Sequence, residues 1–304
     1  MFNVISASTD RFLADLSQLE QRMVKDQRQV SSGLRLQTVS DDPDQVSTLL
    51  QLKARIAHND QLKFNLGRVK TEVDSAENAI NTATTLMDRA RQIAAQGANG
   101  LTSVDTRTQL ASEVGDLISE MYGLTQTQVE GRYVFSGSSD QTPPYASVDF
   151  TQPNSVGSYN GSNATRTVEH PNGSTFSVSL TAQNIFDGNG GDSSVSVLKA
   201  LSNLRADLLS NDVNALQNDA KDIATSAVYL NGRQALYGDI QNQVADAIDF
   251  QNTLSVKLTQ QLSNAEDADA PAAILQMQQD SVAQQAAMQA HIALPRKSLF
   301  DYLG

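Results

Sequence analysis

The chain has 304 residues, a formal net charge of −12 and a pI near 4.6, so it lacks the basic face that nucleic-acid binders use to displace counterions. Cysteine is absent, which excludes disulfides, thiolate nucleophiles and cysteine-ligated zinc. Aromatic residues make up only 5 %, and no apolar run approaches the ~20 residues of a membrane span, so we expect slender helical packing and no membrane partner.

Both ends of the chain carry narrow apolar stripes that predict amphipathic helices. Near the N-terminus, 3/4 spacing aligns Ile5, Phe12, Leu16, Leu19, Met23 and Val30, with polar Thr9 and Asp26 in the gaps. Near the C-terminus it aligns Ile274, Met277, Ser281, Gln284, Met288 and His291. Isolated helices of this kind are marginal in water, so we expect both segments to need a partner. The N-terminus also lacks a basic segment followed by an apolar core, so we expect no cleaved secretory signal.

The stretch "VSSGLRLQTVSDDP" interrupts the helical pattern after the first segment. Gly33 can end that helix in a left-handed conformation. Asp42 can cap the next helix, with Pro43 at its first position and Gln45 closing a capping box. Asp41 adds negative charge at the positive end of the helix dipole. We interpret the stretch as a joint between two helices, with an ordinary loop as the alternative.

Strict heptads follow the joint. They occupy Leu62, Leu66, Val69, Val73, Ala76, Ile80, Ala83, Met87, Ala90 and Ala94. A second stripe holds Leu110, Val114, Leu117, Met121 and Leu124. Gly97 and the Asn-Gly pair at 99–100 separate the stripes, which predicts an antiparallel helical hairpin. A helix from Ser194 to about Leu209 and a long one from Leu216 to Leu262 complete the pattern, and two glycines, Gly232 and Gly238, predict an irregularity in the latter.

Between these halves, residues 131–191 hold 8 of the 17 glycines and favour strands and turns. "TRTVEHPNGSTFSVSL" predicts a hairpin that turns at Pro171–Gly173, and "RYVFSG" and "YASVDF" are further candidate strands. We expect a small β-rich insertion on the tip of a helical rod. The predicted fold is mainly α with this insertion, built as a long antiparallel helical rod in which the chain termini pair as helices.

The predicted domains are a terminal coiled-coil core, a helical rod and an outer β-rich insert. They comprise residues 1–33 with 268–304, residues 34–130 with 194–267, and residues 131–193.

No catalytic constellation is recognisable. His58, His170 and His291 are isolated, and adjacent Asp41 and Asp42 do not converge on a substrate, so we expect no enzyme, cofactor or metal. The loop "DGNGGD" at 187–192 partly resembles calcium loops, but it lacks the EF-hand spacing and a flexible turn is favoured.

Three stretches carry a family resemblance. "QVSSGLRLQTVSDDP", "GRYVFSGS" at 131–138 and the terminal "SLFDYL" at 298–303 resemble the bacterial flagellin superfamily, and within it the branch at the hook-filament junction. The proline after the acid pair is also more similar to that branch than to filament flagellins.

The resemblance implies a structural, flagellin-like protein of the extracellular flagellum, exported unfolded without a cleaved signal. The implied partners are hook-associated protein 1, flagellin, copies of the chain in a ring, an export chaperone and the export apparatus. Terminal segments would form a coiled coil only on assembly. The expected assembly interface comprises Phe2, Ile5, Phe12, Leu16, Leu19, Met23, Ile274, Met277, Met288, Leu299, Phe300, Tyr302 and Leu303. A filament-forming flagellin is the alternative, followed by a ligand-binding or enzymatic insert and a cytoplasmic coiled-coil scaffold.

Overall fold

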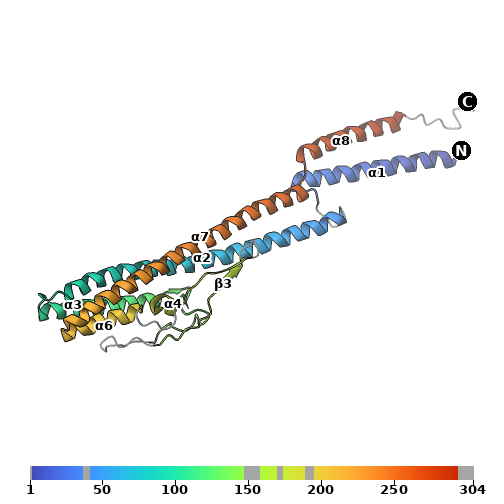
Figure 1. Ribbon diagram of the computed structural model, residues 1–304. Coiled ribbons are helices and arrows are strands. Elements are labelled where there is room, and N and C mark those ends of the chain that lie inside the picture. The colour runs from blue at the N-terminus through green and yellow to red at the C-terminus, as the bar shows by residue number, and fades with distance from the viewer. Residues whose placement is uncertain (1, 37–41, 147–157, 170–173, 189–194, 294–304) are drawn as a thin grey trace, which may run out of the picture. The chain divides into compact units, whose positions relative to one another are not determined.

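The computed structural model describes residues 2–36, 42–146, 158–169, 174–188 and 195–293. Its helices are Phe2–Ser32 (α1), Pro43–Gly97 (α2), Val104–Thr125 (α3), Ala182–Phe186 (α4), Val197–Ser210 (α6), Val213–Glu266 (α7) and Ala270–Ala293 (α8). Its strands are Gln128–Val129 (β1), Arg132–Tyr133 (β2), Thr167–Glu169 (β3) and Thr175–Ser177 (β4). The predicted fold class, mainly α with a small β-rich insertion, is confirmed (Figure 1).

The chain divides into two compact units. One comprises residues 1–60 and 254–304, and the other comprises residues 61–253. The three-part division expected from the sequence stays a prediction.

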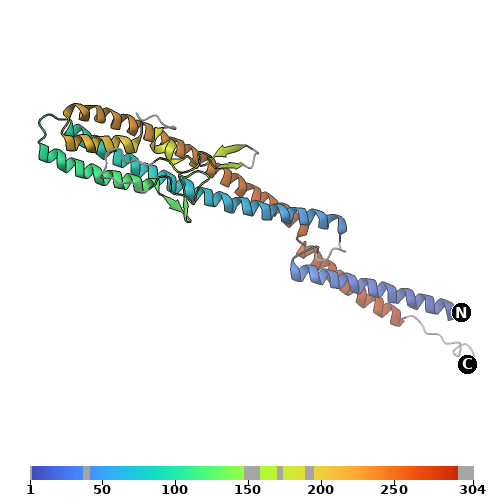
Figure 2. The same cartoon turned by 90° about the horizontal axis from the view of Figure 1, so that it is seen from below.

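In the 61–253 unit, α2, α3, α6 and α7 form a four-helix bundle with one hydrophobic core (Figures 1 and 2). Eight of the ten predicted heptad positions of α2 are buried: Leu66, Val73, Ala76, Ile80, Ala83, Met87, Ala90 and Ala94. The α3 stripe is buried at Leu110, Val114, Leu117 and Met121. An ion pair of 2.5 Å between Arg89 of α2 and Glu113 of α3 ties the two helices together. The predicted helical hairpin is therefore confirmed.

A buried arginine closes the end of this bundle. Arg107 is only 3 % exposed, and its guanidinium donates to the carbonyls of Gly97 at 3.0 Å and Asn99 at 2.9 Å. It also donates to the side chain of Asn211, which ends α6 in the left-handed conformation. One side chain therefore connects the ends of α2 and α6, and it supplies a donor to the Gly97 carbonyl in the last turn of α2.

The second half of the bundle follows the predicted helices, with two differences. The helix α6 begins at Val197, because the Ser196 hydroxyl accepts from the Lys199 N–H at 3.3 Å, and the predicted start at Ser194 lies outside the described residues. The helix α7 is continuous, so the irregularity expected at Gly232 and Gly238 is wrong. A Cβ at either glycine would meet nothing within 4 Å, so neither glycine marks a close approach of chains.

The β-rich insert is confirmed as a hairpin plus irregular chain. Strands β3 and β4 pair antiparallel with Val168 opposite Phe176, and the predicted turn residues 170–173 lie outside the described part. Only Arg132–Tyr133 of "RYVFSG" is strand, paired with β1. Of "YASVDF", Tyr145 forms an isolated bridge with Tyr159, and residues 147–150 are not described.

The position of the insert differs from the prediction. Its buried residues Phe135, Tyr145 and Phe186 belong to the same core as the four helices. The insert therefore lies along the flank of the bundle, beside the middle of the helices (Figure 1), and is not carried on the tip. Large apolar side chains explain the difference, because they bury more surface against the bundle than a separate cap could.

Among the described residues, no helix is both long enough and apolar enough to cross a membrane.

Candidate assembly interface and helix joint

The two terminal helices, α1 and α8, pack along each other in antiparallel directions (Figures 1 and 2). The rings of Phe12 and His291 stack with centroids 4.2 Å apart and planes 16° apart. Arg22 lies 3.8 Å from the buried carboxylate of Asp280, which also accepts from the Gln276 amide at 3.2 Å. The predicted pairing of the termini as helices is thus present in the structure.

The pairing covers α1 only partly. None of the described side chains from residue 9 to residue 32 is buried. The half-buried positions include the predicted Phe12, Leu16, Leu19, Met23 and Val30, together with Asp26. Thr9, which was expected to share this face, is half-buried as well. The side chains of Phe2 and Ile5, and residues Leu299, Phe300, Tyr302 and Leu303, lie outside what the structure describes.

Of the stripe predicted for α8, Met277, Ser281, Gln284 and His291 are half-buried in the single chain, and Ile274 and Met288 are 40 % and 45 % exposed. The face that packs on α1 holds Ala273, Met277, Asp280, Ser281, Gln284, Ala287 and His291. In a helix so rich in Ala and Gln, apolar residues alone do not identify the buried face. The residues of α8 that pack on α1 are mostly small or polar.

Each terminal helix presents a second apolar stripe to solvent. On α8 it comprises Ile274, Leu275, Val282, Met288 and Ile292, of which Val282 is 65 % and Ile292 is 81 % exposed. On α1 it includes Leu13 and Val24, which are 55 % and 43 % exposed. At about 100° per residue, Leu13 and Val24 lie roughly a third of a turn from the half-buried face of α1, whereas the α8 positions range from Met288, at the edge of the packed face, to Leu275 and Val282 on the opposite side. We call this surface the outer stripe.

The joint begins where α1 ends. Gly33 has a φ of +72°, and its N–H donates to the Gln29 carbonyl at 2.9 Å, as a left-handed helix terminus requires. The preceding serine also contributes, because the Ser32 hydroxyl donates to the Arg28 carbonyl at 2.8 Å and accepts from the Leu34 N–H at 3.1 Å. The Ser-Ser-Gly sequence therefore acts as a helix stop.

The second half of the joint starts α2. The Asp42 carboxylate accepts from the Gln45 N–H at 3.2 Å, and the helix begins at Pro43, as predicted. The predicted capping box is incomplete, because the Gln45 side chain accepts from Arg35 at 2.7 Å and is not directed to the backbone of Asp42. Asp41 lies outside the described residues.

Arg35 is the residue that sequence reasoning missed. Its guanidinium donates to Gln45 of α2 and, at 2.9 Å, to the Ala265 carbonyl in the last turn of α7. Its N–H donates to the Glu266 carbonyl at 2.7 Å, and Leu34 pairs with Asp267 as an antiparallel bridge. Arg35 thus connects the start of α2 to the end of α7 through hydrogen bonds. The only sequence signal was its place two residues after Gly33.

The other residues singled out from the sequence include the histidines and the "DGNGGD" loop. Among the described residues, no group of three His, Asp or Glu side chains could hold a metal ion. His58 is exposed, His291 stacks on Phe12, and His170 is not described. In the "DGNGGD" loop, Asp187 accepts from the hydroxyls of Tyr145 at 2.5 Å and Ser196 at 3.1 Å, while residues 189–192 are not described. Burial raises the pKa of the Asp187 carboxyl.

Known proteins resemble this chain in part of its sequence and in its fold. Residues 4–140 match the family described as bacterial flagellin N-terminal helical region. Over 119 residues, the chain is 29 % identical to flagellar hook-associated protein 3 of Escherichia coli K12, covering 39 % of this chain and 38 % of that protein. Over 125 residues, it is 26 % identical to flagellin of Listeria monocytogenes, covering 41 % and 42 %. Each alignment thus spans less than half of the relative's length.

A solved structure extends the comparison. Hook-associated protein 3 of Legionella pneumophila superposes with a TM-score of 0.60 at 15 % identity, covering 71 % of this chain and 98 % of that one. The flagellin-like fold is therefore confirmed. Together these matches confirm the resemblance inferred from the sequence: the chain is similar to flagellar hook-associated protein 3, and its residues 4–140 match the bacterial flagellin N-terminal helical region.

Proposed function

We propose that this chain is a non-enzymatic structural protein of the bacterial flagellum that joins a ring of hook-associated protein 1 to the flagellin filament. The observation that carries the proposal is the outer stripe. The helix α1 has no buried side chain in its described part, and α8 exposes apolar side chains such as Val282 and Ile292 to solvent. Exposed apolar surface of this kind favours association with other chains.

The proposed mechanism couples ordering of the ends to assembly. One α1–α8 pair buries few side chains, so its order is marginal when the chain is alone. Contact with neighbouring subunits would cover the outer stripe and shift the ends toward the folded state by mass action. The predicted interface residues from Phe2 to Met23 and from Ile274 to Leu303 would then lie between copies in a ring.

The proposal extends to the route by which the chain reaches this place. An export chaperone would cover the apolar C-terminal segment in the cytoplasm, and the export apparatus would pass the chain unfolded to the extracellular junction. A chain with marginal ends and no cysteine is compatible with such a route.

A filament-forming flagellin is the second candidate, favoured by the match to Listeria flagellin. Self-assembly separates the two candidates, because a flagellin polymerises into long filaments alone and a junction protein does not. Electron microscopy of the purified protein, seeded with filament fragments, would distinguish the two candidates. Long filaments of this chain alone would refute the junction role.

Gene deletion in a flagellated cell that encodes this chain tests the function. We expect cells with intact hooks, no filaments and flagellin shed into the medium. Filaments of normal length on the deletion strain would contradict the proposal.

Complementation then tests the outer stripe. Val282→Asp places a charge on it, and Ala283→Asp makes the matched change at the adjacent exposed position outside the stripe. We expect both variants to be secreted, but only Ala283→Asp to restore filaments. Equal restoration by both would show that the outer stripe is not an assembly surface.

Limited proteolysis tests the state of the free chain. We expect early cleavage within α1 and α8 and a resistant core within residues 61–253. Ends as resistant as that core in a dilute monomer would contradict coupled ordering.

A further inference from the structure

The distribution of basic residues in the β-rich insert is unusual. Residues 131–193 contain no lysine and only two arginines, Arg132 and Arg166. Both line one pocket of the 61–253 unit, and Arg68 of α2 lines the same pocket. In a chain of net charge −12, the insert therefore places all of its arginine charge at a single point.

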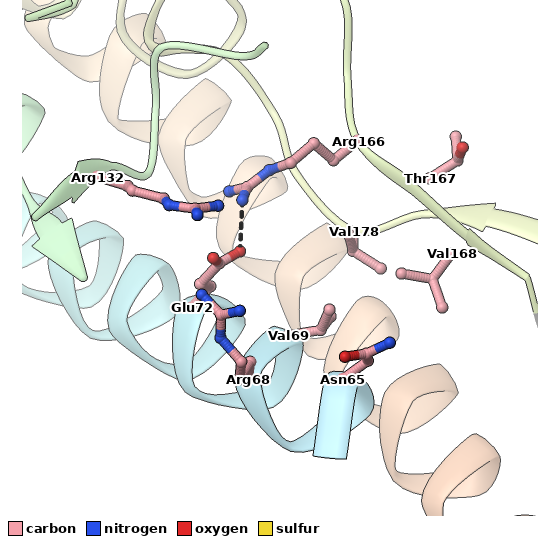
Figure 3. A pocket seen from close by; sticks show the side chains of 9 residues that line it. All are labelled: Asn65, Arg68, Val69, Glu72, Arg132, Arg166, Thr167, Val168 and Val178. Atoms are coloured by element: carbon pink, nitrogen blue, oxygen red, sulfur yellow. Dashed lines mark ion pairs between the residues drawn. The ribbon is translucent and has the colours of Figure 1, made fainter. Parts of the chain in front are cut away.

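The pocket lies where the insert meets α2. It has a volume of about 290 Å³ and is lined by Asn65, Arg68, Val69, Glu72, Arg132, Arg166, Thr167, Val168 and Val178. Figure 3 shows the guanidinium groups of Arg132 and Arg166 directed toward each other, with the Glu72 carboxylate next to them. The three valines supply an apolar wall beside this charged group.

The lining side chains do not balance one another. Arg166 forms an ion pair of 2.8 Å with Glu72, the one acid among the lining residues. The Nε of Arg166 is buried and has no hydrogen-bond partner among the described residues. Three guanidinium groups therefore face the pocket with a single carboxylate, and a buried donor remains for a further acceptor.

Two acids that do not line the pocket also pair with these arginines. Glu130 reaches Arg68 at 2.6 Å, but the Glu130 side chain is 59 % exposed. Asp140 lies 3.6 Å from Arg132. The Arg132–Asp140 pair is too long for a hydrogen bond, so a better-placed anion can compete for Arg132.

We propose that this pocket binds a carboxylate carried on a short aliphatic stem. The planar guanidinium groups of Arg132 and Arg166 offer the fork geometry that suits a carboxylate, and Val69, Val168 and Val178 accommodate the stem. Such a group occurs in a free small dicarboxylic acid and in the acidic side chains of another protein. Neither the family resemblance nor the proposed function is needed for this inference.

Calorimetric titration of the full chain tests the proposal, with glutarate and a hexaglutamate peptide as probes at constant ionic strength. The net charge of −12 repels both probes, so saturable binding would be local. We expect at least one probe to bind with a millimolar or lower Kd. Glutarate binding would assign the site to free acids, and binding of the peptide alone would assign it to acidic protein surfaces.

Matched variants complete the test. Arg132→Gln should weaken binding at least tenfold, and Arg132→Lys should restore part of it. Because Arg132 is 46 % exposed and pairs only at 3.6 Å, we expect its variants to keep the wild-type circular dichroism spectrum. Arg91→Gln, on an exposed face of α2, should bind like the wild type. No saturable heat from either probe, or equal affinity in Arg132→Gln, would overturn the proposal.

Discussion

The acidic cluster where α6 meets α7 makes the stability of the 61–253 unit sensitive to pH. Asp219 is only 5 % exposed, and one of its carboxylate oxygens is buried without a hydrogen-bond partner among the described residues. Burial, followed by the negative charge of nearby Asp207, raises the pKa of Asp219 to about 7, and Asp222 and Asp212 add smaller repulsions. Asp219→Asn removes the charge with almost no change in volume.

The sign follows from proton linkage. The folded state holds a proton on Asp219 that the unfolded state releases above its ordinary pKa of 3.8, so stability falls as pH rises from about 4 to about 7 and then levels off. At 1.36 kcal/mol per pKa unit, ionisation of Asp219 costs up to about 4 kcal/mol. Because Asp207 shares the titration, we expect about half of this ceiling. Asp219→Asn should therefore be about 2 kcal/mol more stable than the wild type at pH 8 and nearly equal to it at pH 4.

Urea unfolding followed by tyrosine fluorescence measures this difference. Six of the seven tyrosines lie between residues 122 and 237, and the chain has no tryptophan, so the signal reports on the 61–253 unit. Asp222→Asn, at an exposed position on α7, is the matched control and should change stability much less. An equal stability difference at pH 4 and pH 8, or a less stable Asp219→Asn at pH 8, would refute the reasoning.

Three further changes test the helix ends and the insert. Arg107→Ala should lower the free energy of unfolding by about 3 kcal/mol in the same urea assay, because the carbonyl of buried Gly97 and the side chain of Asn211 lose their donor; a loss below 0.5 kcal/mol would contradict this. Gly33→Ala should cost about 1 kcal/mol locally and speed amide exchange at Ala268, whose N–H bonds the Gly33 carbonyl; unchanged exchange would exclude a strained joint. Tyr145→Phe should cost about 1–3 kcal/mol, more at pH 8 than at pH 4, because ionised Asp187 loses a donor; a pH-independent loss would refute that role.

The long helices were predictable because their cores follow a strict period. Heptad positions such as Ala76, Ile80 and Ala83 are buried, and small residues at these positions let neighbouring helices approach closely. The stop at Gly33 and the start at Asp42 were also predictable, since each depends on the local chemistry of one or two residues.

The residues that connect distant parts of the chain were not predictable. Arg35 and Arg107 act through partners that the fold brings together, at separations of up to 230 positions in the sequence for Arg35. The exposed face of α8 was missed for a different reason. Its Ala and Gln residues give almost no amphipathic signal, so only contact with α1 identifies the covered side.

The incomplete burial of α1 has a consequence for how the ends respond to concentration. A helix pair with no buried residue in the described part of α1 gains too little apolar burial to offset the entropy of ordering both segments. If neighbours cover the outer stripe, order at the ends must increase with the logarithm of partner concentration, while the 61–253 unit stays constant. Amide exchange at several protein concentrations should therefore slow in residues 8–32 and 270–293 and not in the α2–α3 core. Exchange that is independent of concentration in both regions would mean that α1 and α8 order each other without neighbouring subunits.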